Sequence, residues 1–123
     1  MKKLISCNLT IKSIIDNKEE NIVISGDGYY KEEGNVVIVY FSCDGTKYKY
    51  IYDKEKLIIE CGDSIYEFEE GVKRKGKIKN GNYVFEITTL ANKLEIGKEK
   101  IILSYVLMQE FIIGEYFMEL TIN

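Results

Sequence analysis

The fold is decided by residues 36–52, which read VVIVYFSC, then DG, then TKYKYIY. An Asp-Gly pair between two runs rich in valine, isoleucine and tyrosine is a strong signal for a β-hairpin with a two-residue turn. After the turn, Tyr48, Tyr50 and Tyr52 alternate with lysine or isoleucine. Side chains alternate between the two faces of a strand, so the pattern puts the three tyrosines on one face. We expect that face to point inward.

The same signals recur along the whole chain. Turn residues (glycine, asparagine and aspartate) return about every 8–12 residues, which is the spacing typical of an all-β domain. No segment shows helical periodicity over more than a turn. The expected strands lie at 3–14, 22–30, 36–43, 48–52, 57–61, 66–68, 72–78, 83–87, 94–96, 101–108 and 113–122.

Three local details refine this prediction. Gly26 and Gly28 interrupt the second strand, which indicates a bulge or a sharp bend of the kind found at a barrel corner. Asn80-Gly81 is a second strong hairpin signal. The strand that follows it is expected to point Tyr83, Phe85 and Ile87 inward.

Length and composition agree with one all-β domain. The chain has 123 residues, 46% of them hydrophobic, with 19 isoleucines and a single alanine. A long antiparallel meander leaves exposed edges unless it closes on itself or folds into two sheets. We therefore predict that residues 1–123 form a single antiparallel β-barrel of about eight to ten strands, with little or no helix.

Composition also excludes several kinds of chemistry. The sequence has no histidine, so histidine-based catalysis and histidine metal sites are absent. Cys7, Cys43 and Cys61 stand far apart and form no Cys-x-x-Cys motif, so we expect three reduced thiols. No nucleophile–base pair is visible. The sequence therefore disfavours an enzyme, and we expect no metal and no cofactor.

Charge and hydropathy bear on partners and location. The net charge is −3, and only one of the 17 basic residues is an arginine, which disfavours nucleic acid as a partner. Leu4-Ile5-Ser6-Cys7 matches a lipoprotein cleavage site, but the apolar run before it is too short for a signal peptide. No stretch approaches the length of a membrane helix. We expect a cytoplasmic monomer or homodimer with no membrane partner.

From Ile22 onward the sequence resembles the small bacterial YwiB-like proteins, a family of unknown function. The resemblance is carried by seven segments in the same order: SGDGYY with VIVY, LIIECG, YEFEEG, FEITT, ILSYVL and FMELTI, which begin at Ser25, Val37, Leu57, Tyr66, Phe85, Ile102 and Phe117. It implies a lipocalin-like, or calycin-like, β-barrel and supplies no activity.

The sequence departs from that family in three places. Glu60 stands where the family usually has an arginine, so a site built on that arginine would be missing here. Residues 89–91 lack the proline and glycine that the family tends to have. The segment between Leu94 and Ile101 is shortened.

The tyrosines are the first candidate site. If the row at 48–52 faces inward, its hydroxyls enter a closed barrel, where they need hydrogen-bond partners. A barrel of about eight strands is just wide enough to be filled by side chains or to hold one small ligand. Core packing and ligand binding both remain open. The candidate ligand-binding residues are Tyr48, Tyr50, Tyr52, Tyr66 and Tyr105.

A basic cluster is the second candidate site. It comprises Lys73, Arg74, Lys75 and Lys77, and it could hold an anion or attract an acidic partner. The alternative is an edge strand whose lysines prevent sheet-to-sheet pairing.

Two functions follow from the two sites. One is a non-catalytic binder of a small, partly apolar ligand in the barrel, and the other is a structural or protein-interaction module with a filled interior.

Overall fold

The computed structural model describes residues 2–123, which form ten antiparallel strands joined in a closed barrel. Around the barrel the strands follow the order β1-β10-β9-β8-β7-β6-β5-β4-β3-β2. This part of the chain contains no helix, and therefore none that could span a membrane. The predicted fold class is thus confirmed. The strands are β1 Lys2–Ile15, β2 Lys18–Glu33, β3 Val36–Cys43, β4 Thr46–Tyr52, β5 Lys56–Cys61, β6 Ser64–Glu69, β7 Lys73–Asn80, β8 Tyr83–Ile96, β9 Lys100–Met108 and β10 Ile112–Ile122.

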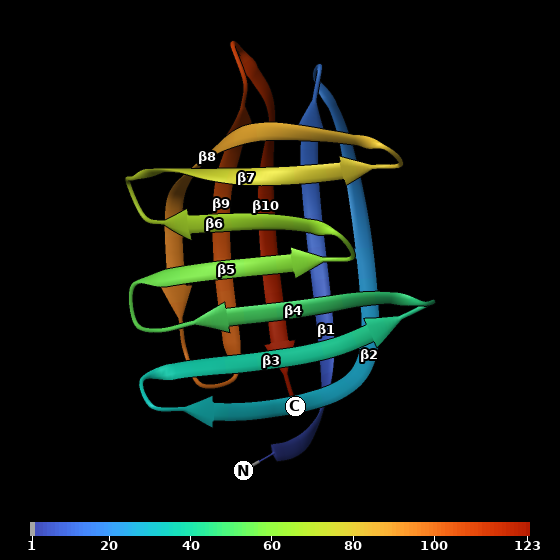
Figure 1. Ribbon diagram of the computed structural model, residues 1–123, viewed down its shortest axis with the longest axis vertical. Coiled ribbons are helices and arrows are strands. Elements are labelled where there is room, and N and C mark those ends of the chain that lie inside the picture. Colours follow the sequence, from blue (N-terminus) through green and yellow to red (C-terminus); the bar gives the residue numbers. More distant parts are fainter. Residues whose placement is uncertain (1) are drawn as a thin grey trace.

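The barrel is flattened into two layers whose strands cross at a steep angle (Figure 1). Strands β3 to β7 run across the front of the view, and β9, β10 and β1 run lengthwise behind them. The long strands β2 and β8 curve from one layer into the other and close the barrel at two corners. Such an arrangement is an orthogonal packing, in which bent strands belong to both sheets.

The corner in β2 depends on two glycines. Residues 18–33 form one continuous strand without a bulge, and this strand curves into the second layer near Gly26 and Gly28, so of the two predicted alternatives the bend is the one observed. A Cβ atom on Gly28 would lie 1.6 Å from the carbonyl oxygen of Tyr40, and one on Gly26 would lie 2.1 Å from that of Ser42. Only glycine lets β2 pass so close to the backbone of β3.

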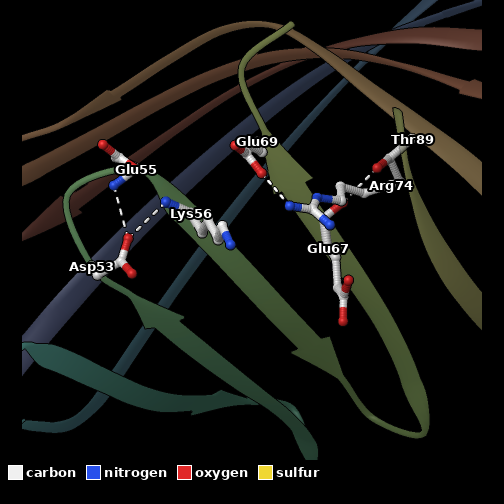
Figure 2. A network of polar contacts seen from close by, with 7 residues as sticks. All are labelled: Asp53, Glu55, Lys56, Glu67, Glu69, Arg74 and Thr89. Carbon is white, nitrogen blue, oxygen red and sulfur yellow. Dashed lines mark hydrogen bonds and ion pairs between the residues drawn. The ribbon is translucent and has the colours of Figure 1, made fainter. Parts of the chain in front are cut away.

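The turns follow the sequence signals closely. Asp44 and Gly45 both have positive φ, 49° and 81°, as a type I′ hairpin requires. In the β7–β8 hairpin Asn80 pairs with Tyr83, so the two turn residues are Gly81 and Asn82, one position later than predicted. At the β4–β5 turn the Asp53 carboxylate accepts hydrogen bonds of 2.8 Å from the backbone N–H groups of Glu55 and Lys56 (Figure 2).

Strand β8 contains two departures from the prediction. Residues 94–96 are the end of this long strand and do not form a separate one. Tyr83 and Phe85 are exposed, whereas Ile87 is buried, so two members of the expected inward row are wrong. The physical reason is that β8 pairs with β9 only from Thr88 onward. The first residues of β8 therefore extend beyond the core, and no other layer covers them.

Candidate functional site

The tyrosine row of β4 faces the interior of the barrel, as the alternation predicts. Tyr50 is 1% exposed, Tyr52 is 5% exposed and Tyr48 is half-buried. Both neighbours of β4 place inward-facing residues beside this row, with Val39 opposite Tyr50 on β3 and Ile59 opposite it on β5. The row is therefore part of the hydrophobic core.

Tyr50 lies at the centre of that core. Its ring is 6.1 Å from the ring of Phe41, and its hydroxyl donates a hydrogen bond to the Met118 sulfur at 3.2 Å. Burial raises the pKa of Tyr50 well above its usual value, because the phenolate would have no water around it. The hydroxyl is therefore neutral, and its partner is a weak acceptor.

Tyr66 and Tyr105 reach the core from β6 and β9. The ring of Tyr105 lies 4.7 Å from Phe68 and stacks at 5.0 Å on Tyr116, while Tyr66 stacks on Phe68 at 6.4 Å. Burial raises the pKa of both tyrosines, most strongly that of Tyr105. Both predicted residues therefore contact the ring of Phe68, and Tyr105 also contacts that of Tyr116. The predicted site did not include Phe68 or Tyr116.

Tyr52 has a different environment from the other tyrosines. Its hydroxyl is buried and has no hydrogen-bond partner among residues 2–123. Burial raises the pKa of Tyr52, and the nearby Tyr30 and Glu32 raise it further. The Tyr30 hydroxyl donates its proton to the Glu32 carboxylate at 2.8 Å and so does not donate to Tyr52. A buried hydroxyl without a partner costs free energy. The Tyr52 hydroxyl is therefore a buried polar group that can still form a hydrogen bond.

The interior contains one hydrophobic core of buried side chains. None of the five candidate tyrosines lines any of five hollows found on the outer surface. Their ligand-binding role therefore stays a prediction. The buried core consists of Ile5, Cys7, Leu9, Val39, Phe41, Tyr50, Tyr52, Leu57, Ile59, Phe68, Ala91, Ile101, Leu103, Met118, Leu120 and Ile122.

A hollow of about 570 Å³ opens on the outer surface where β6 meets β7, and we call it the cationic hollow. It brings together all four residues of the predicted basic cluster. Four of its side chains are cationic and two are anionic, in a protein whose net charge is −3. The lining residues are Ile65, Glu67, Lys73, Arg74, Lys75, Gly76, Lys77 and Glu86.

The cationic hollow exists because the β6–β7 ladder contains a bulge. Ile65 and Tyr66 pair with Lys77 and Gly76, and the next bridge joins Glu69 to Val72. Three residues of β7 thus stand opposite two of β6, and such a bulge displaces the strand from regular pairing. Strand β7 belongs to the closed barrel, but it pairs with β6 only at Gly76 and Lys77, so protection of an unpaired edge by its lysines stays a prediction beside anion binding.

Two contacts stabilise the bulge from inside (Figure 2). The hydroxyl of Thr89 on β8 donates to the carbonyl oxygen of Glu67, so the backbone group that the bulge leaves out of the ladder is satisfied. The Arg74 guanidinium donates to the Glu69 carboxylate, and both side chains are largely covered. The predicted basic cluster did not include Glu69, so sequence reasoning missed this ion pair.

The lysines of the cationic hollow are free to meet a partner. Lys73, Lys75 and Lys77 alternate along β7 on its outer face and are all exposed. Lys77 stands opposite Glu86 in the β7–β8 register, an acidic residue that sequence reasoning did not include. Counting back from the predicted turn at Asn80-Gly81 would have placed Val84 opposite Lys77, so only the observed turn at Gly81 and Asn82 gives this pairing. No group of histidine, cysteine or acidic residues suited to a metal occurs between residues 2 and 123.

The fold and the site define a closed ten-stranded antiparallel barrel with a buried hydrophobic core and a cationic hollow on its outside. This barrel is similar in structure to the ywiB protein from Bacillus subtilis, with a TM-score of 0.83 and 17% sequence identity. The similarity covers 99% of this chain and 92% of that one. The resemblance noted in the sequence is thus confirmed at the level of the fold.

Comparisons of sequence add nothing to the structural similarity. No protein-family model matches the chain. A search of curated proteins also finds no significant match.

Proposed function

We propose that this barrel is a non-catalytic module for protein–protein interaction, and that the cationic hollow binds an acidic segment of its partner. One observation carries the proposal: all four residues of the basic cluster line one hollow on the outside of the barrel. A surface hollow of this kind can receive carboxylate side chains without unfolding any part of the core.

The electrostatics favour an acidic partner over a neutral one. The three exposed lysines present strongly hydrated point charges, which attract acidic groups over distances of about one Debye length, roughly 8 Å at physiological salt. Glu67 and Glu86 line the same hollow, and their negative charges weaken the attraction for an acidic partner. We therefore expect binding that depends on salt and on the number of acidic residues in the partner segment.

Arg74 contributes to recognition in a second way. Its ion pair with Glu69 fixes the position of the guanidinium. A guanidinium has five N–H donors, so one carboxylate does not exhaust it. The fixed side chain keeps donors available beside Lys73 and Lys75, and it needs no further ordering when a carboxylate arrives.

The test is binding of a fluorescein-labelled decaglutamate peptide, followed by fluorescence anisotropy at about 50 mM and about 300 mM NaCl. We compare the native chain with the triple variant Lys73→Glu, Lys75→Glu and Lys77→Glu. The matched control carries Lys3→Glu, Lys54→Glu and Lys98→Glu, three exposed lysines elsewhere that change the net charge by the same amount.

We expect the hollow variant to lose about tenfold or more in affinity, and the control about threefold or less, because local charges act over a Debye length. Binding by the native chain should weaken at the higher salt concentration. Equal losses in the two variants would mean that only net charge matters, and the proposal would be wrong. Absence of binding by the native chain would overturn it as well.

One observation favours a second candidate function, the binding of a small molecule inside the barrel. The buried hydroxyl of Tyr52 has no partner among the described residues and could bond to a small polar group on a partly apolar ligand. A thermal-shift screen of small molecules against the native chain and Tyr52→Phe tests it. Compounds that raise the melting temperature of the native chain alone would support this function, and a screen without any such compound would count against it.

A further inference from the structure

Half of strand β2 has an unpaired edge. Strand β2 pairs with β1 from Lys18 to Lys31, but it pairs with β3 only from Gly28 to Glu33. Residues 18–25 therefore have a neighbour on one side only. In Figure 1 this part of β2 runs lengthwise along one side of the barrel, beside β1.

The direction of the unpaired backbone groups follows from the hydrogen bonds of β1. Ser6 exchanges backbone hydrogen bonds of 2.9 and 2.8 Å with Asn123, so the even residues of β1 bond toward β10. The odd residues must then bond to β2, where Ile11 is opposite Ile22. The odd residues of β2 point their N–H and C=O groups away from β1. Glu19, Asn21, Val23 and Ser25 thus present four donors and four acceptors to solvent.

This edge has few of the features that usually prevent strand addition. Val23 is 72% exposed and Ile22 is 46% exposed. The β1–β2 register runs without a bulge, and the chain contains no proline. Charged side chains occur only at its first three residues, 18–20. A regular, unpaired edge with exposed apolar residues is a template for pairing with another strand.

The unpaired edge of β8 gives a useful contrast. Residues 83–87 lack a second neighbour, but the Gln109 side chain donates a hydrogen bond of 3.3 Å to the carbonyl oxygen of Glu86. That edge is short and partly occupied by a side chain. The edge of β2 is longer, and no side chain within residues 2–123 bonds to its outward backbone groups.

We propose that two copies of this chain associate by antiparallel pairing of their β2 edges about a two-fold axis at Ile22. In this register Asn21 faces Val23 of the second copy, and Glu19 faces Ser25 of the second copy. It is the arrangement that uses all four outward-bonding residues of each chain. A two-fold axis lets one surface serve both partners, so the strand needs only to complement itself.

Charge supports a second copy as the occupant and supports this register. The charged residues Lys18, Glu19 and Glu20 all lie at one end of the unpaired edge, where Glu19 forms an ion pair with Lys12 of β1, and the other end is neutral. Antiparallel pairing about Ile22 sets the charged end of each copy against the neutral end of the other. Parallel pairing, or an axis at Glu20, would place like charges directly opposite each other, which is destabilising. The association is independent of the acidic partner proposed above.

The first test is sedimentation equilibrium of the native chain from low micromolar to near-millimolar concentration. We expect a reversible monomer–dimer equilibrium that Val23→Lys weakens about tenfold or more, since lysine on an edge opposes pairing. Tyr83→Lys, on the other unpaired edge, is the matched control and should leave the equilibrium unchanged. A native chain that stays monomeric throughout the range would overturn the proposal, as would equal effects of the two variants.

The second test fixes the register by crosslinking. The variants Ile22→Cys and Glu20→Cys are made in a chain that also carries Cys43→Ser and Cys61→Ser. Only a residue on the two-fold axis faces its own copy, within the Cα separation of about 4.4–6.8 Å that a disulfide spans. We expect mild oxidation to give a covalent dimer with Ile22→Cys and little with Glu20→Cys. The opposite result, or no crosslink in either variant, would refute this register.

Discussion

The interior tyrosine row and the exterior lysine row use the same alternation for opposite purposes. On β4 the row that faces inward carries Tyr50 and Tyr52 in an almost dry core, and its hydroxyls stay protonated. On β7 the row that faces outward carries Lys73, Lys75 and Lys77 around an open hollow. The inner row stabilises the barrel, and we infer that the outer row recognises a partner. Stability and binding should therefore respond to different substitutions.

The comparison predicts its largest effect for truncation of the inner row. Tyr50→Ala removes a fully buried ring, and loss of a large aromatic side chain from a core costs about 3–5 kcal/mol of unfolding free energy. Lys75→Ala, on the outer row, should cost within about 0.5 kcal/mol. Urea unfolding followed by circular dichroism measures both. Similar costs for the two variants would contradict the division between the rows.

Alkaline pH should also act on the buried interior, to which the inner row belongs. Burial raises the pKa of Cys7 to about 11 and raises those of Tyr50 and Tyr105 as well. The unfolded chain releases these protons at lower pH than the folded chain does, so the unfolding free energy falls as pH rises above about 9. Urea unfolding at pH 8, 9 and about 10.5 measures the decrease. A flat profile over this range would show that the interior admits water.

The smallest expected effect concerns a single hydroxyl. Tyr50→Phe removes only the hydrogen bond to the Met118 sulfur and keeps the ring in place. We expect a change in unfolding free energy within about 1.5 kcal/mol, the usual net value of one hydrogen bond. The variant should also lose part of the decrease at alkaline pH, because phenylalanine does not ionise. A larger loss at neutral pH would indicate a polar network at Tyr50 that the packing does not reveal.

Local chemistry made much of the fold predictable. Asp44-Gly45 predicted its hairpin because the turn needs two positive φ angles, and alternation predicted the inward row at 48–52. Alternation also misled for Phe85, since it predicts which face a side chain takes and not whether another layer covers that face. Whether a strand's face is covered depends on how far its neighbours extend, which a single sequence does not contain.

The candidate sites were predictable only in part. The basic cluster was visible in the sequence, but the cationic hollow depends on a one-residue shift between β6 and β7. That shift is fixed by tertiary contacts, among them the bond from Thr89 to the Glu67 carbonyl. The unpaired edge of β2 was hidden for a similar reason, because its length is set by where β3 begins to pair at Gly28.

The central claim is that the outer surface of the barrel binds a partner and that the interior stabilises the fold. A nuclear magnetic resonance titration tests this claim most directly. Decaglutamate is added to the ¹⁵N-labelled chain, and the amide shift of each residue is followed. The account predicts shifts that gather at residues 65–67, at 73–77 and at Glu86, the residues of the cationic hollow. Shifts centred on Tyr50 and Tyr52, or shifts spread evenly over all exposed lysines, would contradict it.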